Sequence, residues 1–444
     1  MARQVCAVLL AATFERARAG GVLRSLVLLL TIAGAAAPAA AQAPSCTPLQ
    51  QNMFVRDVMT DLYLWYREVP AVSVTAYDTP EAYLEAVRYR PLDRTFSYIT
   101  SREASDAFFS DSQFIGFGFS MSLNGSELRV TEVYPESPAK EIDLARGARI
   151  LEINGRAVAE LVRTGEIDDA FGASEIGVAV DLLFERGPLA TRARMVKRLV
   201  TIPTVSETRV ITFDGRKVGY VFFRNFVEPS HEALDRAFAE LRAAQVTELV
   251  LDLRYNGGGL VPVAQHLASL IGGVRANGQV FAEYFHNDRY PDLNRVTRFD
   301  QRPEALTLDR VIVVTTRASA SASELVINSL RPFMPVWIIG ERTYGKPVGQ
   351  YGIPFCDKVF APVSFTIRNA DGQGDFFEGL QPNCRAADDV EHQIGDPLEG
   401  SLREALTVIA TGQCSRPAAT PSAAPRRVPA FPAGTGWQAL VGAH

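Results

Sequence analysis

Three serines and one lysine carry side chains that could act together as a nucleophile and its base. Ser319, Ser321 and Ser323 alternate with alanines in residues 318–323, and Lys346 follows in the segment Thr-Tyr-Gly-Lys-Pro. A serine hydroxyl becomes a good nucleophile only when a neighbouring base takes its proton. A lysine can be that base if burial lowers its pKa enough to leave the amine neutral. The residue types therefore indicate a candidate Ser/Lys pair.

Lysine is scarce in this chain, which makes Lys346 stand out. Only five of the 45 Lys and Arg residues are lysines, so positive surface charge is made mainly with arginine. Arginine is not deprotonated in proteins and could not replace a lysine base. Lys346 also lies between a glycine and a proline, and it follows the apolar run 336–339 in the sequence. The alternative is a structural or surface lysine.

Other catalytic arrangements have weaker support in the sequence. None of the five histidines lies in a recognisable catalytic motif, and no Gly-x-Ser-x-Gly segment is present. No His-Glu-x-x-His or Cys-x-x-Cys segment indicates a zinc site either. We therefore expect no metal and no cofactor.

Regular elements on both sides would position the serines. The apolar run 311–314 predicts a buried strand, and residues 324–330 predict a helix that ends before Pro332. A residue at the start of that helix would lie beside backbone N–H groups without intrahelical acceptors. Such a position favours an anion and suits a developing oxyanion.

Residues 199–414 alternate strand and helix patterns. Strands are expected at 218–223, 249–253 and 336–339, with a helix at 261–271. This alternation predicts an α/β fold with a mostly parallel sheet. The Asn-Gly-Gly-Gly segment 256–259 and the serine segment both follow strands, so both could face one crevice at the carboxyl ends of the strands.

The flanking regions differ in pattern. Residues 44–111 show apolar residues at helical spacing and predict a helical N-terminal segment, with Thr79 as the cap of a helix that starts at Pro80. Residues 415–444 are rich in Pro and Ala and predict a disordered tail.

Residues 112–198 contain short strands and resemble a PDZ domain of the bacterial protease type. The resemblance rests on Gly116-Phe117-Gly118-Phe119, on the Ser-Pro-Ala segment 137–139 and on the Ile-Leu-Glu-Ile-Asn-Gly segment 150–155. It implies that Gly116, Phe117, Gly118 and Phe119 form a loop that holds a peptide C-terminus, beside a strand edge that accepts an extended peptide. For the glycines alone, a tight turn is the alternative.

The N-terminus predicts export. Arginines precede an apolar run at 26–33, and a small-residue segment follows up to Ala43, so residues 1–43 read as a cleavable signal peptide. A membrane anchor, or a lipid anchor at Cys46, is the alternative. We expect a periplasmic or extracellular location. Residues 1–43 carry four arginines and one glutamate, so the remainder has a net charge of −8, which argues against a nucleic-acid partner.

Four cysteines lie outside the predicted signal, namely Cys46, Cys356, Cys384 and Cys414. An even number in an exported chain predicts two disulfides, and three pairings are open. We favour Cys356–Cys384, because the two residues flank an apparent hairpin region, with Cys46–Cys414 as the second bond. Free buried thiols are the alternative.

The serine and lysine segments together resemble the C-terminal processing (tail-specific) proteases, which are Ser/Lys peptidases related to tricorn. The resemblance covers residues 50–413 and implies a ClpP/crotonase-like protease core with an inserted PDZ domain and a helical N-terminal segment. It implies Ser321 as nucleophile, Lys346 as general base at the family spacing of 25 residues, and Gln350 as the side chain that orients the lysine. Residues 252–259, Asp-Leu-Arg-Tyr-Asn-Gly-Gly-Gly, match a family motif that implies the N–H groups of Gly258 and Ala322 as the oxyanion hole.

Two positions depart from the family pattern. Pro347 replaces a glycine that follows the lysine, and Pro332 stands where some members carry an aspartate. Neither change removes the nucleophile, the base or the oxyanion donors.

The resulting expectation is an exported serine endopeptidase that acts on polypeptides with accessible C-termini. An inactive PDZ scaffold and a hydrolase of non-peptide acyl substrates are the alternatives. The physiological substrate and the oligomeric state do not follow from the sequence.

Overall fold

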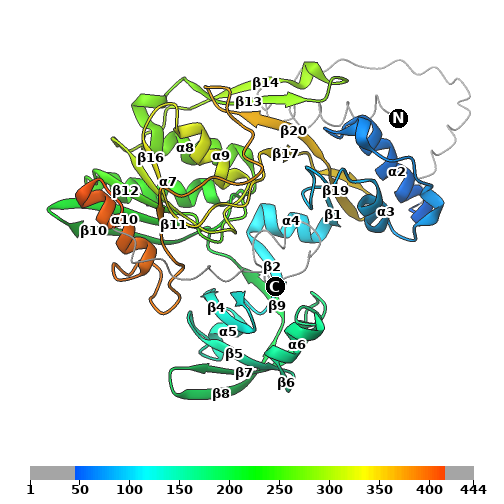
Figure 1. Ribbon diagram of the computed structural model, residues 1–444, viewed down its shortest axis with the longest axis horizontal. Coiled ribbons are helices and arrows are strands. Elements are labelled where there is room, and N and C mark those ends of the chain that lie inside the picture. Colours follow the sequence, from blue (N-terminus) through cyan, green and yellow to red (C-terminus); the bar gives the residue numbers. More distant parts are fainter. Residues whose placement is uncertain (1–45, 416–444) are drawn as a thin grey trace, which may run out of the picture.

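The structure is a computed structural model that describes residues 46–415 (Figure 1). The predicted signal peptide lies outside the described residues, as does the predicted Pro/Ala-rich tail apart from Ser415. The described chain has a mixed α/β fold, with an N-terminal helical segment, a small β domain and a larger α/β core. None of the helices in residues 46–415 has the length and apolarity needed to cross a bilayer.

A six-stranded sheet forms the centre of the core, in the order β10-β11-β12-β15-β16-β21. β10 runs antiparallel to β11, whereas the five strands from β11 to β21 are parallel, so the predicted mostly parallel sheet is confirmed. The strands are β10 (Val205–Phe213), β11 (Arg216–Phe223), β12 (Glu248–Asp252), β15 (Val311–Thr315), β16 (Val336–Gly340) and β21 (Cys384–Arg385).

Helices cover both faces of this sheet. Leu251 and Val313 point into a core shared with three helices, and Val250 and Val314 point into a second core on the other face. Because successive side chains of a strand alternate between faces, a strand covered on both sides reads as a continuous apolar run. The helices of the first face are α7 (Ser230–Ala243), α8 (Val261–Ala276) and α9 (Ala322–Leu330), and the second face is covered by α10 (Gly400–Thr411).

The N-terminal segment packs against two smaller sheets of the core. Its residues Val55, Met59 and Tyr63 share a hydrophobic cluster with Phe360 and Val363. The expected cap is present, since Thr79 Oγ1 accepts the N–H of Ala82 at 3.2 Å. The segment contains α2 (Pro48–Asp61), η1 (Tyr66–Glu68), η2 (Val74–Ala76) and α3 (Pro80–Val87).

The first small sheet, β1-β19-β18, joins the N-terminal segment to the core through the antiparallel pair β1 and β19. The second small sheet has the order β14-β13-β20-β17. The elements are β1 (Tyr98–Ser101), β13 (Val280–His286), η4 (Pro291–Leu293), β14 (Arg295–Arg298), β17 (Val348–Gln350), β18 (Ile353–Phe355), β19 (Lys358–Ala361) and β20 (Val363–Arg368).

The region expected to be a PDZ domain forms a separate β domain, in the lower part of Figure 1. Its main sheet has the order β3-β4-β5-β7-β8 and encloses its own hydrophobic core, while the antiparallel pair β2 and β9 lies at its connection to the rest of the chain. The helix α4 (Arg102–Asp111) leads from β1 into this region. The elements of the region are β2 (Gln113–Gly116), β3 (Phe119–Asn124), β4 (Glu127–Val133), α5 (Pro138–Glu141), β5 (Arg149–Ile153), β6 (Arg156–Ala157), α6 (Val158–Thr164), η3 (Asp169–Phe171), β7 (Ala179–Arg186), β8 (Leu189–Val196) and β9 (Arg198–Thr201).

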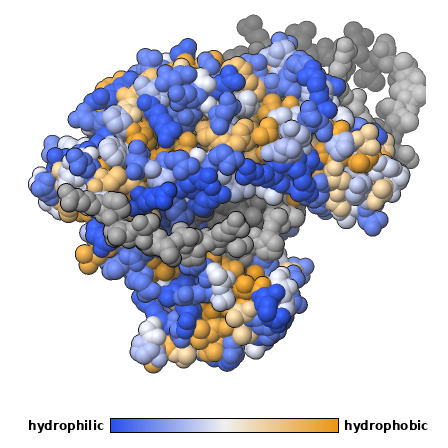
Figure 2. All heavy atoms as spheres, viewed as in Figure 1, coloured by the Kyte–Doolittle hydropathy of each residue, from blue (hydrophilic) through white to orange (hydrophobic). Residues whose placement is uncertain are grey.

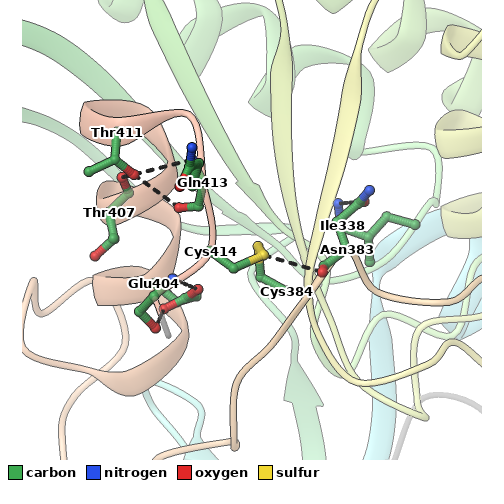
Figure 3. Close-up of a disulfide and its surroundings, with 9 residues drawn as sticks. Ile338, Asn383, Cys384, Glu404, Thr407, Thr411, Gln413 and Cys414 are labelled. Carbon is green, nitrogen blue, oxygen red and sulfur yellow. Dashed lines mark hydrogen bonds between the residues drawn. A yellow bond between two sulfur atoms is a disulfide. The ribbon is translucent and has the colours of Figure 1, made fainter. Parts of the chain in front are cut away.

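Two disulfides are present, but the pairing that we favoured is wrong. The bonds are Cys46–Cys356 and Cys384–Cys414. Cys356 lies in the turn between β18 and β19, next to Phe355, whose ring stacks on Phe54 of α2. This packing brings the segment before α2, with Cys46, to the turn. Cys384 lies in β21, and α10 returns across the same sheet and brings Cys414 beside it (Figure 3). Packing of distant segments, and not nearness in sequence, decides both bonds.

The two disulfides close loops of very different length, with sequence separations of 310 and 30 residues. In the chain-entropy model, the longer loop restricts the unfolded chain more, so its bond should contribute about 2 kcal/mol more to the free energy of unfolding. We expect the C46S/C356S double variant to be less stable than the C384S/C414S variant by that amount, measured by urea unfolding without reductant. Equal stability of the two variants would contradict this account.

Candidate active site

Ser321 is the residue immediately before α9, after the turn that follows β15. Its backbone has φ 55° and ψ −112°, a region that residues with a side chain rarely occupy and that costs about 1–3 kcal/mol. Ser321 is partly exposed, whereas Ser319 and Ser323 are fully buried. Their hydroxyls donate to the carbonyl oxygens of Leu253 and Asn256, at 2.8 and 2.9 Å. The two flanking serines therefore hold the loop, and only the middle serine faces outward.

Lys346 has the environment that a neutral lysine base requires. Its side chain is only 5% exposed, and burial lowers its pKa to about 8, against opposing effects of Asp93 and Glu324. Nζ donates to Gln350 Oε1 at 2.6 Å. The amide group of Gln350 in turn donates to the carbonyl oxygens of Phe96 and, at 2.8 Å, of Ala361. These two acceptors fix the amide with its oxygen toward the lysine.

The N-terminal segment completes the lysine environment, which the sequence did not indicate. Lys346 Nζ lies 5.8 Å from the centre of the Phe96 ring, and Asp93 is the first of the two charges that raise the lysine pKa. Asp93 is fully buried and accepts the N–H groups of Phe96 and Ser97 at 2.8 and 3.0 Å. No local motif marks either residue, because their role depends on the packing of a distant segment.

The serine and lysine loops lie side by side. The N–H of Tyr344 donates to the carbonyl oxygen of Ser319 at 2.9 Å, and the carboxylate of Glu324 accepts the N–H groups of both Ser321 and Lys346. Within residues 46–415, the side-chain hydrogen bond of Lys346 goes to Gln350 and none joins Nζ to Ser321. Catalytic hydrogen bonds are often long in unliganded enzymes and tighten when substrate binds.

The glycine loop 257–259 lies directly against Ser321, as expected for one crevice. A Cβ at Gly258 would lie 2.9 Å from both Ser321 Cβ and the nitrogen of Ala322, so only glycine fits there. The N–H of Ala322, the first residue of α9, has no intrahelical acceptor. The N–H of Gly258, however, donates to Asn256 Oδ1 at 2.9 Å. In residues 46–415 the N–H of the neighbouring Gly257 makes no hydrogen bond.

A buried ionic network supports the glycine loop from behind. Tyr255 has a positive φ of 65°, and its hydroxyl donates to Asp388 while accepting from Arg146 at 2.9 Å. Arg224 donates to the carbonyl oxygen of Tyr255 and forms an ion pair with Glu132 at 2.7 Å. Since Arg146 and Glu132 belong to the β domain, this domain helps to hold the loop in place.

Gly116, Phe117, Gly118 and Phe119 lie apart from the serine and lysine loops, at the join of β2 and β3. Both phenylalanine rings are buried and pack near Phe171. Gly118 has φ 83°, and a Cβ there would overlap the side chain of Ser137. The Ser-Pro-Ala segment therefore packs directly on this loop.

One group of side chains in residues 46–415 has ligand atoms close enough for a metal ion, namely Cys384, Glu404 and Cys414. The two cysteines form a disulfide there (Figure 3), so the thiolates that a metal requires are consumed. The described histidines have partners away from Ser321; for example, His266 contacts Asp235 and His286 contacts Tyr351.

Family models match two parts of the chain. Residues 217–386 match peptidase family S41, and residues 50–98 match the peptidase S41 N-terminal domain. The chain is 27% identical over 263 residues to the carboxy-terminal processing protease CtpB of Bacillus subtilis (strain 168), covering 58% of this chain and 52% of the relative. It is also 27% identical over 273 residues to the carboxy-terminal-processing protease of Bartonella bacilliformis, covering 59% of each. The chain thus spans about half the length of the curated relatives that it matches.

Solved structures give the same picture of the fold. A protein assigned as an S41 protease from Bacteroides fragilis NCTC 9343 has a TM-score of 0.66 at 27% identity, covering 80% of this chain and 97% of its own. The photosystem II D1 C-terminal processing protease has a TM-score of 0.50 at 22% identity, covering 86% of this chain and 100% of its own. The resemblance to the C-terminal processing proteases is therefore confirmed.

The burial of Lys346 leads to a prediction of the pH at which its amine titrates. With ¹³Cε-labelled lysine, the five lysines of the chain give few enough NMR signals to resolve, and the K346M variant identifies one of them. We expect that signal to titrate at about pH 8, because burial disfavours the charged amine. Titration above pH 10, as for an exposed lysine, would contradict a neutral base at this position.

Proposed function

We propose that this chain, which belongs to peptidase family S41, is a serine endopeptidase with Ser321 as nucleophile and Lys346 as general base. The observation that carries the proposal is the buried Lys346 amine, whose pKa is lowered to about 8 and which Gln350 holds at 2.6 Å. It lies on a loop in direct contact with the loop of Ser321. A base with a pKa near the working pH transfers protons efficiently in both directions.

The proposed reaction has two stages. Neutral Lys346 takes the proton of the Ser321 hydroxyl as its oxygen attacks the scissile carbonyl carbon, and the resulting ammonium then protonates the departing amine. This leaves an acyl group on Ser321. Water attacks the acyl carbonyl in the second stage, losing its proton to Lys346, and the Ser321 oxygen regains a proton as the product acid leaves. Gln350 keeps the amine directed toward the reacting atoms throughout.

The tetrahedral intermediate needs donors for its negative oxygen. The N–H of Ala322 is suitable, because it stands at the first position of α9 next to the nucleophile. We propose that a backbone N–H of the glycine loop 257–259 is the second donor. Gly258 contacts Ser321 but its N–H is bonded to Asn256, so either this bond opens on substrate binding or the Gly257 N–H takes its place.

We propose that the β domain is a PDZ domain that binds the C-terminus of the substrate. In support, β3 is an edge strand of the domain sheet and can accept an extended peptide. Within the described residues the N–H groups of Phe117 and Gly118, beside this edge, make no hydrogen bonds and are available to a carboxylate. Hydrophobic side chains are also exposed on this domain, which Figure 2 shows in the lower part of the view; they include Ile176, Leu189, Val196 and Leu199.

We further propose that the protein works outside the cytoplasm. Its two disulfides support this, because such bonds persist in oxidising compartments and are rare in the cytosol.

The Ser/Lys assignment is tested with purified wild type, S321A, K346A and K346R on an unfolded polypeptide with an apolar C-terminus. We expect all three variants to lose at least about 10³-fold in kcat/KM, since the nucleophile or the base is absent and arginine stays charged. Cleavage by all proteins at the same rate would exclude the dyad. No cleavage by any of them would instead favour the inactive scaffold, and activity only on activated esters or thioesters would favour a non-peptide hydrolase.

The role of the β domain is tested with two peptides that differ only at the C-terminus, one with a free carboxylate and one amidated. Hydrogen bonds to a charged group contribute about 1.5–3 kcal/mol, so we expect the amidated peptide to bind about 10- to 100-fold more weakly in a fluorescence titration with the S321A variant. Equal affinity for the two peptides would exclude carboxylate recognition.

A further inference from the structure

Glu324 lies three residues after the candidate nucleophile, as the third residue of α9, and is fully buried. We propose that Glu324 is a positioning residue whose carboxylate holds the Ser321 and Lys346 loops in the relative arrangement that proton transfer requires. This inference rests on the proposed Ser/Lys reaction and adds a residue that acts through both partners without touching the substrate.

The carboxylate receives four hydrogen bonds, and all of its donors lie in the two catalytic loops. Oε2 accepts the backbone N–H groups of Ser321 and Lys346, at 2.9 and 2.8 Å. Oε1 accepts the N–H of Gly345 at 2.7 Å and the hydroxyl of Thr343 at 2.5 Å. A single oxygen atom thus contacts the backbone of both members of the dyad.

Each of these partners is a donor, which selects a carboxylate at this position. Thr343 Oγ1 accepts the N–H of Leu380 at 2.7 Å, so its own hydrogen is free for Glu324. A glutamine would turn an NH₂ group toward two donors and lose those bonds. Burial raises the pKa of Glu324, and the four donors oppose that effect by stabilising the charged form.

The two loops need such an anchor because their backbones are irregular. Gly345 has a positive φ of 96°, which glycine adopts without strain, whereas Ser321 is held in a conformation that residues with a side chain rarely populate. Residues in such conformations persist only when surrounding contacts fix them. Without the carboxylate, the N–H groups of Ser321 and Lys346 would lose their common acceptor, and a shift of about 1 Å between reacting groups can lower a rate about 10²-fold.

Glu324 also acts on the lysine through its charge. The charged groups that act on Lys346 are Asp93 and Glu324, and both raise its pKa against the effect of burial. Removing the Glu324 charge should therefore lower the lysine pKa and move the acidic limb of the rate profile to lower pH. A residue that only stabilised the fold would not move this limb.

The test compares wild type with E324Q, T343V and T343S in kcat and KM on an unfolded polypeptide between pH 5 and 10. For E324Q we expect kcat to fall about 10²-fold with little change in KM, and the acidic limb to move to lower pH. T343V, which loses one of the four donors, should show a smaller fall in kcat, about tenfold. T343S keeps the hydroxyl and should recover activity relative to T343V.

E404Q is the matched control, because Glu404 is another buried glutamate, on α10, with Ser415 as its partner and no contact to either loop. It should leave kcat and the pH profile unchanged. Wild-type kcat with an unmoved pH profile in E324Q would overturn the inference. If E324Q does not fold, equal activity of T343V and T343S would overturn it.

Failure of this inference is distinguishable from failure of the proposed function. Activity that depends on Ser321 and Lys346 but not on Glu324 or Thr343 would leave the dyad in place and remove the positioning role. Activity that survives S321A would remove the dyad itself.

Discussion

The burial of one amine is the constraint on which the candidate site depends. An ammonium group in a pocket with little water is costly, and this cost makes the neutral form of Lys346 accessible near pH 8. The pocket exists only because three parts of the chain meet there. The β17 strand supplies Gln350, the N-terminal segment supplies Asp93 and Phe96, and α9 supplies Glu324. The Cys46–Cys356 bond fastens the N-terminal segment to the same side of the core.

Behind the glycine loop, buried basic side chains stay charged and are paired with carboxylates. There, Arg254 is fully buried but contacts Asp252 and Glu399, each at 2.8 to 2.9 Å, so its charge is balanced. Buried ion pairs of this kind contribute little net stability, but removal of one partner is strongly destabilising. Behind the glycine loop, buried arginines are thus paired with carboxylates, whereas Lys346 forms no ion pair within residues 46–415.

The regular structure of the core could be predicted from the sequence, and a candidate for the nucleophile could be named. The apolar run 311–314 and the alternation of strands and helices gave the parallel sheet, since buried parallel strands have a distinctive pattern. Periodicity could not separate the three serines, and the family resemblance selected Ser321. The burial of the three side chains supports this choice, because Ser319 and Ser323 are buried and Ser321 is partly exposed.

Contacts between segments far apart in the sequence could not be predicted. The disulfide pairs, the Asp93 contribution and the bond from Gly258 to Asn256 all depend on tertiary packing. Glu324 was visible as part of the helix that follows the serines, and an acidic residue in the first turn of a helix is common. Its four donors come from loops whose positions the sequence did not give.

The anchoring of the lysine loop also explains which of its neighbours are free to vary. Gly345 is confined, since a Cβ would lie 2.3 Å from the carbonyl oxygen of Phe377. The N–H of Lys346 is already used by Glu324, so the following residue is not required to supply that bond. Proline, which has no N–H and a fixed φ, is therefore compatible with position 347. The loop thus accepts a residue without an N–H directly after Lys346, whereas the position directly before Lys346 accepts only glycine.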